Sequence, residues 1–396
     1  MRRAGQGNLH LARWLAICSG CRFGLGIWIL YFLHYTTYAG IGVAEALMIL
    51  VALLAEIPTG VLADRLGRKR SLSLAYLGFS IGFLIVSLAD SYSFLLFGLL
   101  VFVLGRAMHS GTFEAFVFEN SQDPFIFESH IVKLHSLRLA AFAGSCALGG
   151  FAFNIWPRLP YFLTTLACFV GLVLTLFIQE KPSSLDSEKG QNLLDVTPIQ
   201  LFLAWRPQTH IAFVILAGGM ILVFCDEILD DALAVAFGFS PHHLGLLFAV
   251  VHLLSALASQ QSGFLKKRIG SVRLMGWILL LCSLSLLLSP VFGLFFGGAS
   301  VVLRYMCRTV WTNLESIWLN ASIQHANRAT ALSCYAMFKS LPYVLLAFPA
   351  GKWMDSSGPF QLGICVGLIL LPIGGTFLMG HFQDRCHQKP PSVFQK

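Results

Sequence analysis

Ionisable side chains stand inside several of the most apolar stretches of this 396-residue sequence. Seven of them are Arg22, Arg106, Arg304, Arg308, Asp226, Glu227 and Asp230. A charge near the centre of a lipid bilayer costs about 2.5 to 3.5 kcal/mol on insertion scales, so each needs a partner of opposite charge or a water-filled cavity. Arginines in such a cavity can bind an anionic or polar solute, and carboxyl groups there can take up and release a proton.

Two of these stretches carry arginine and glutamate on one helix face. Glu114 follows Arg106 by eight residues, and Arg304, Arg308 and Glu315 lie on nearly the same kind of stripe. At a rise of about 1.5 Å per residue, Arg106 and Glu114 are roughly 10 to 12 Å apart along the axis. They cannot pair directly within one helix.

The arginines are the candidate substrate-binding groups, with one aromatic residue that can shape a cavity: Arg22, Arg106, Arg304, Arg308 and Phe113. The candidate proton-coupling acids are Asp226, as first choice, and Glu227, Asp230, Glu114 and Glu315. We expect Arg22 to pair with Asp226 or Glu227. The alternative interpretation is a set of structural ion pairs that fix helix packing.

No other chemistry is indicated by the residue pattern. His242 and His243 are adjacent, without the two-histidine spacing of a metal site, and no nucleophile elbow is present. The sequence also lacks a GxxxxGK[ST] phosphate-binding loop. We therefore expect no catalytic residue, metal or cofactor, and we expect neither an enzyme nor an ATP-driven pump.

The elements that carry these residues are too apolar for a soluble fold. Hydrophobic residues make up 56% of the chain and charged residues 12%, and the mean hydropathy is +0.74. A helix that crosses the hydrocarbon core needs about 20 apolar residues, so this length allows about twelve crossings. The sequence predicts an all-α integral membrane protein.

The apolar runs fall into two sets of six. The first set predicts helices near 12–33, 38–60, 71–89, 93–117, 134–155 and 160–179, and the second near 210–233, 242–264, 273–289, 292–319, 329–350 and 361–381. We predict an N-terminal six-helix bundle over 1–179, a cytoplasmic linker with a short amphipathic helix over 180–209, and a C-terminal bundle with a cytoplasmic tail over 210–396.

Lysine and arginine are concentrated in the segments on one side of this arrangement. The positive-inside rule then puts both termini in the cytoplasm. The net charge of +8 is explained by this topology, so it gives no reason to expect a nucleic acid partner.

A charged turn follows the second predicted helix. It reads Gly60-Val-Leu-Ala-Asp64-Arg65-Leu-Gly67-Arg68-Lys69-Arg70. A second copy at a constant offset of 203 residues, Gly263 to Arg273, matches Gly60, Leu62, Arg65, Gly67 and Arg70 but lacks the aspartate. A weaker version, Gly351-Lys-Trp-Met-Asp355-Ser-Ser-Gly358, follows the eleventh helix on the opposite side.

The first turn closely resembles the loop signature of the Major Facilitator Superfamily, and the whole chain resembles bacterial efflux-like permeases of that superfamily. The resemblance implies twelve transmembrane helices in two pseudo-symmetric six-helix bundles, with helices 1, 4, 7 and 10 around a central cavity. The seven charged residues lie on those four helices. It also implies a gating motif that latches the cytoplasmic side, formed here by Gly60, Asp64, Arg65, Gly67, Arg68 and Arg70.

We therefore expect a secondary active transporter that moves a small organic solute by alternating access, coupled to protons. One alternative is a multidrug or amphiphile efflux pump of the same superfamily, and another is a channel or receptor-like protein on a transporter fold. The expected partners are a small-molecule substrate, protons and membrane lipid. We expect a monomer in the bacterial inner membrane.

Overall fold

The computed structural model describes residues 2–121, 124–179, 209–322 and 328–379. These residues are almost entirely helical and include no β-strand. The elements up to residue 179 are α1 (Arg2–Gly20), η1 (Leu25–Ile27), α2 (Trp28–Phe32), α3 (Tyr38–Leu66), α4 (Arg68–Leu88), α5 (Tyr92–His109), α6 (Thr112–Asn120), α7 (Pro124–Ile155) and α8 (Leu159–Leu176). We call this part the N-terminal half.

The part from residue 209 onward, the C-terminal half, is built from the same kind of long helix. Its elements are α10 (Thr209–Phe224), the π-helical turn η3 (Cys225–Leu229), α11 (Asp230–Ala236), α12 (Pro241–Ile269), α13 (Ser271–Leu287), η4 (Ser289–Val291), α14 (Leu294–Ser322), α15 (Arg328–Ser357) and α16 (Pro359–Met379). The predicted linker and C-terminal tail lie outside the described residues, apart from their edges.

Eight helical stretches within the described residues are long and apolar enough to cross a membrane. They comprise the six predicted spans of the N-terminal half, together with α12 and α16. The other four predicted spans coincide with helices in α10 to α11, α13, α14 and α15. The protein is therefore an all-helical integral membrane protein, as predicted, whereas the number twelve remains a prediction.

Three predicted helices are not continuous α-helices. The first is interrupted between Gly20 and Leu25, and the fourth breaks at Ser110 and Gly111. Gly111 has a φ of 69°, in the left-handed region that glycine adopts most easily. The seventh helix widens into η3, and π turns of this kind often occur at functional sites. Each of the three interruptions lies next to a predicted site residue.

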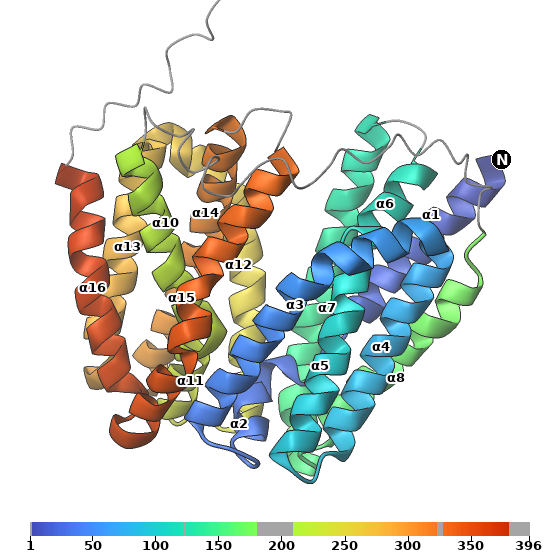
Figure 1. The fold of residues 1–396 in the computed structure, drawn as a ribbon. Helices are drawn as coiled ribbons and strands as arrows, with labels where there is room; N and C mark the ends of the chain where they lie inside the picture. Colours follow the sequence, from blue (N-terminus) through green and yellow to red (C-terminus); the bar gives the residue numbers. More distant parts are fainter. Residues whose placement is uncertain (1, 122–123, 180–208, 323–327, 380–396) are drawn as a thin grey trace, which may run out of the picture.

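The two copies of the charged turn have the same backbone conformation. Gly67 links α3 to α4 with φ 83° and ψ 165°, and Gly270 links α12 to α13 with φ 89° and ψ 146°. Both residues need a positive φ, which explains why a glycine recurs at the offset of 203. We call the end of the molecule that carries these turns the upper end, as it is drawn in Figure 1.

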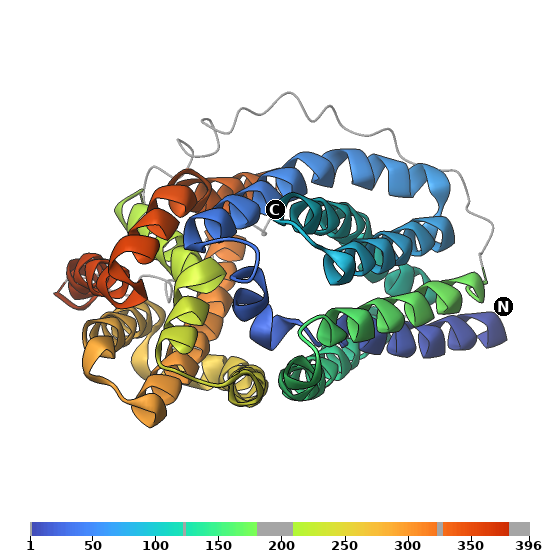
Figure 2. The same ribbon diagram turned by 90° about the horizontal axis from the view of Figure 1, so that it is seen from below.

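Helices α1 and α4 to α8 gather on one side of the molecule and the C-terminal half on the other, while α2 and the start of α3 lie beside the C-terminal helices (Figures 1 and 2). Two helix pairs, α7 with α12 and α3 with α15, bring the halves together. Glycines permit these close approaches. A Cβ on Gly245 would lie 2.5 Å from the Cys146 carbonyl oxygen, and one on Gly42 would lie 2.3 Å from that of Ala347. Both contacts lie near the lower end.

Candidate functional site

Two cavities meet at one arginine. The first, which we call the basic pocket, has a volume of about 380 Å³ within the N-terminal half and is lined by Arg22, Arg106, His109, Glu114, His135 and Arg138, among others. The second, the central cavity, has a volume of about 310 Å³ and lies between the halves. Its charged lining residues are Arg22, Glu45, Asp226, Glu227 and Asp231. One cavity therefore carries mostly cations and the other mostly acids.

Arg22 lies in the break between α1 and η1. Its backbone N–H donates to the Ser145 hydroxyl at 3.1 Å, so α7 holds the broken segment in place. The guanidinium lies 4.9 Å from the ring centroid of Phe102 and 5.7 Å from that of Phe142. Among the described residues Arg22 has no ion pair, and the predicted pair with Asp226 or Glu227 is not formed.

The predicted residues Arg106, Phe113 and Glu114 all line the basic pocket. Arg106 lies in the last turn of α5, and the break at Gly111 lets α6 present Phe113 and Glu114 to the same space. Arg138 and His135, which reach the pocket from α7, are not among the predicted site residues. Arg138 lies inside the predicted span 134–155, so the rule that selected the other arginines applies to it equally.

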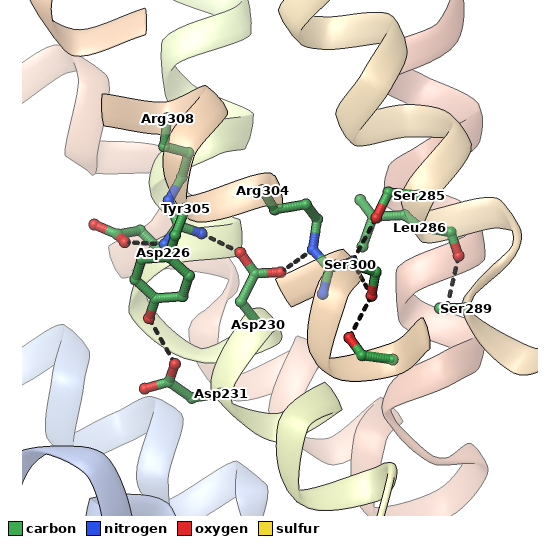
Figure 3. Close-up of polar contacts among 11 residues, drawn as sticks. Asp226, Asp230, Asp231, Ser285, Leu286, Ser289, Ser300, Arg304, Tyr305 and Arg308 are labelled. Atoms are coloured by element: carbon green, nitrogen blue, oxygen red, sulfur yellow. Dashed lines mark hydrogen bonds and ion pairs between the residues drawn. The ribbon is translucent and has the colours of Figure 1, made fainter. Parts of the chain in front are cut away.

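Arg304 lines neither cavity. Its guanidinium contacts Asp230, Ser285 and Ser300 (Figure 3), while its Nη2 is buried without a hydrogen-bond partner among the described residues. Its Nε donates to Asp230 Oδ1 at 2.5 Å, and its side chain is 1% exposed while that of Asp230 is fully buried. Another guanidinium nitrogen donates to the Ser285 and Ser300 hydroxyls at 2.7 and 3.2 Å. Because buried ion pairs need such extra hydrogen bonds, this arrangement is well suited to fix α11 against α13 and α14.

Arg308, one helical turn further along α14, joins the second carboxylate oxygen of Asp230 to Asp226. The contact with Asp226 is 2.6 Å long, and the Asp226 side chain is 54% exposed. The guanidinium of Arg308 also lies 3.9 Å from the centroid of the Tyr305 ring. Asp226 is thus the member of this network that faces the central cavity.

Asp231 connects the two halves. The indole N–H of Trp28 on α2 donates to its Oδ2 at 2.5 Å, and the hydroxyl of Tyr305 on α14 donates to its Oδ1 at 2.7 Å. Asp231 is 7% exposed. Asp231 is not among the predicted site residues, because nothing in the local sequence pattern indicates that α11 meets α2.

Glu45 and Glu227 also face each other across the halves. Glu45 is on α3 and Glu227 on η3, both line the central cavity, and their carboxyl groups are within hydrogen-bonding reach. Two carboxyl groups that close stay together when one carries a proton, and repel each other when both are ionised.

Glu315 is separate from both cavities' linings. It is 3% exposed, accepts a hydrogen bond from the Tyr335 hydroxyl at 2.5 Å and pairs with Lys339 Nζ at 2.8 Å. These contacts join α14 to α15. The structure therefore does not bring the predicted acids together: Glu114 lines the basic pocket, Asp226 and Glu227 line the central cavity, and Asp230 and Glu315 are buried in pairs.

The predicted gating motif lies at the upper end, where Gly67 makes the turn into α4. Arg68 Nε pairs with Glu119 of α6 at 2.8 Å, and Arg70 lines a shallow surface hollow. Gly60 and Arg65 are on the last turns of α3. The side chain of Asp64 is outside the part that the structure describes.

A carboxylate from the weaker copy of the motif joins the two halves near the lower end. Asp355 of α15 accepts hydrogen bonds from the backbone N–H groups of Tyr38 and Ala39, at 2.8 and 3.0 Å. Thr37, at the N-cap position of α3, makes no side-chain cap of its own. Asp355 therefore supplies the cap from the other half and also interacts favourably with the helix dipole.

No group of three or more potential metal ligands occurs among the described residues.

One ion pair lies outside both cavities. Arg158, between α7 and α8, contacts Asp90 at 2.6 Å, and the Asp90 side chain is 85% exposed. This hydrogen bond raises the pKa of Arg158 above its ordinary value.

The sequence model of the Major Facilitator Superfamily matches residues 15–341. No curated protein matches the chain. Among solved structures, the nucleoside transporter NupG is similar over 95% of this chain and 98% of its own, with a TM-score of 0.74 and 14% identity. A POT family transporter in complex with 5-aminolevulinic acid is similar over 95% of each chain, with a TM-score of 0.72 and 13% identity. At such identities these likenesses concern the fold.

Proposed function

The chain belongs to the Major Facilitator Superfamily, and on that premise we propose that it moves a small organic solute across the membrane by alternating access, coupled to protons. The observation that carries this proposal is the central cavity, which lies between the two halves and is lined by ionisable residues from both. A binding site shared by two halves can be exposed to either side when the halves tilt against each other.

We extend the proposal to the architecture. Twelve transmembrane helices would form two pseudo-symmetric bundles over 1–179 and 210–396, joined by a linker with a short amphipathic helix. The matching turns at Gly67 and Gly270 support such a duplication. Both termini would lie in the cytoplasm of a bacterium, with the upper end inside, and the protein would act as a monomer.

The lower end would then be the outer gate, closed in this conformation. Three kinds of contact support that assignment: the glycine packing of the helix pairs, the bridge from Trp28 through Asp231 to Tyr305, and the cap that Asp355 places on α3. All three join the N-terminal half to the C-terminal half. Opening this end would require breaking them together.

Proton coupling would use the acids that line the central cavity. Asp226 is exposed there and touches Arg308, so taking up a proton would remove one of the two acid partners of that arginine. Glu227 would share a proton with Glu45 while the halves are close. Loss of that proton would leave two like charges facing each other, which favours separation of the halves.

Efflux of amphiphilic compounds is the second candidate. The observation that favours it is the aromatic lining of the central cavity, which includes Trp28, Phe83, Phe102 and Phe248. Such rings offer broad apolar contact to a drug-like molecule.

A thermal-shift screen of the purified protein against metabolites and amphiphilic drugs separates these candidates, since a ligand that binds the native state raises its melting temperature. Counterflow of the labelled hit in proteoliposomes then tests the carrier mechanism. A carrier shows faster labelled entry when unlabelled solute is inside, and in a channel internal solute brings no acceleration. Entry without counterflow would contradict the proposal.

A further inference from the structure

The basic pocket holds more positive charge than its surroundings neutralise. Arg22, Arg106 and Arg138 line it together with His109 and His135, whereas Glu114 is the one acid of its lining. Within the described part of the chain, none of the three arginines has an ion pair. This contrasts with Arg304 and Arg308, which are neutralised by aspartates.

Two side-chain nitrogens in the pocket are buried without a hydrogen-bond partner in the part of the chain that the structure describes. The Nε of Arg138 and the Nε2 of His109 have no hydrogen-bond partner, although another nitrogen of Arg138 contacts His135 Nδ1 at 3.1 Å. The His109 ring is stacked on Phe113, with centroids 5.1 Å apart, so packing holds it in place. Buried polar groups without partners are rare in native proteins and call for an explanation such as a missing ligand.

The arginines come from three different elements and converge on one space. Arg22 comes from the break after α1, Arg106 from α5 and Arg138 from α7. A guanidinium is planar, always charged and rich in donors, which suits it to bidentate binding of carboxylate or phosphate. A volume of about 380 Å³ falls within the range of small-ligand sites.

We propose that the basic pocket binds the anionic group of the transported solute, which is therefore an organic anion with a carboxylate or phosphate group, and that Arg138 is one of its binding residues. This inference rests on the transport function proposed above. The rest of the solute extends past Arg22 into the central cavity, since Arg22 lines both. Arg304 and Arg308 take no part in binding, because Asp230 and Asp226 already hold them.

The test measures anion binding by the purified full-length protein in a neutral detergent. The probes are inorganic phosphate, glutarate and glycerol 3-phosphate, with glycerol and sodium chloride of equal ionic strength as references. We expect at least one anionic probe to raise the melting temperature beyond the sodium chloride reference and glycerol to have no effect. Equal shifts with sodium chloride and with all anionic probes would overturn the proposal.

Variants assign the effect to the pocket. We expect Arg138→Gln to weaken binding of the effective probe at least tenfold and Arg138→Lys to restore part of it, because lysine keeps the charge and loses the bidentate geometry. Arg158→Gln is the matched control, since it removes an equal charge near the lower end, where Arg158 pairs with Asp90. Equal affinities in Arg138→Gln and Arg158→Gln would contradict the assignment. Should Arg138→Gln fail to fold, Arg106→Gln carries the same expectation.

A phosphate group can belong to a solute or to a lipid. A third part of the test therefore adds a short-chain phosphatidylglycerol at a concentration that saturates its binding. Competition by the free anions supports a solute site, whereas stabilisation by this lipid alone would overturn it. The results also distinguish the two proposals. Anion binding without counterflow would contradict the carrier mechanism. Counterflow of a neutral solute that Arg138→Gln leaves unchanged would contradict the anion site.

Discussion

At the scale of single residues, the structure distinguishes arginines that form ion pairs with aspartates from arginines that form no ion pair among the described residues. Arg304 and Arg308 share Asp230, and Arg308 also holds Asp226, whereas Arg22 lies against aromatic rings. All of them stand at similar depths in the sequence pattern. The difference follows from the neighbouring elements, because η3 and α11 present Asp226 and Asp230 to the arginines of α14.

Asp226→Asn tests the proton-coupling role. The amide keeps the shape of the side chain but can neither take up nor release a proton. We expect uptake driven by a pH gradient to be abolished, while counterflow at a single pH continues. Both are measured in proteoliposomes with the labelled solute. Asp90→Asn, at the exposed pair with Arg158, is the control and should leave both unchanged. Gradient-driven uptake at the normal rate in Asp226→Asn would contradict the role.

Asp230→Ala tests the structural role of the buried network. The change leaves the guanidinium of Arg304, which is 1% exposed, without its acid. Removing one partner of a buried ion pair typically costs about 3 to 5 kcal/mol. We therefore expect a markedly lower melting temperature, whereas Asp90→Ala should cost less than about 1 kcal/mol because its pair is exposed. An equal loss of thermal stability in the two variants would contradict the structural role of Asp230.

At the scale of the helices, hydropathy located the apolar runs well and their interruptions poorly. A window average does not register that Gly111 must adopt a positive φ, or that η3 contains a wider turn. Yet these interruptions place Arg22, Phe113 and Asp226 in cavities. Local deviations are often stabilised by tertiary contacts, such as the hydrogen bond from the Arg22 backbone to Ser145, and such contacts between distant residues are not encoded in one segment.

Gly245→Ala tests the close packing of α12 on α7. The added methyl group would lie 2.5 Å from the Cys146 carbonyl oxygen and 2.9 Å from the backbone of Gly150, so the helices must separate. We expect lower thermal stability and weaker closure of the lower end. Gly144→Ala on α7 is the matched control, because its Cβ would meet nothing within 4 Å. Since alanine favours a helix over glycine, the control should be neutral or slightly stabilised.

At the scale of the whole molecule, the sequence predicted the internal repeat but not the contacts between the two halves. The offset of 203 residues predicted that Gly67 and Gly270 are equivalent, and their backbone angles agree. The contacts between the halves have no such signature, because Asp231 and Asp355 find their partners on helices distant in the sequence. The sequence suggested the family and the charged cavity, but it left open which acids hold the halves together.

Asp355→Asn tests whether the lower end is a gate. An amide is a weaker cap for α3 than a carboxylate, since it lacks the charge that favours the helix N-terminus. We expect the lower end to open more often. Cys146, which is buried at the α7–α12 contact, would then react faster with a small thiol reagent, as quantified by mass spectrometry. Ser356→Ala, next to it and exposed, is the control. An unchanged Cys146 rate in Asp355→Asn would argue against this gate.

The π turn at Cys225–Leu229 determines in which direction the side chains of the following helix, α11, point. It contains one residue more than ordinary helical geometry would use, and in an α-helix one residue corresponds to about 100° of rotation. If the same residues wound as a regular α-helix, Asp230 and Asp231 would be turned by about 100° away from Arg304 and Tyr305. With the surplus residue, the four neighbouring acids divide between the central cavity, which Asp226, Glu227 and Asp231 line, and the buried ion pairs of Asp230.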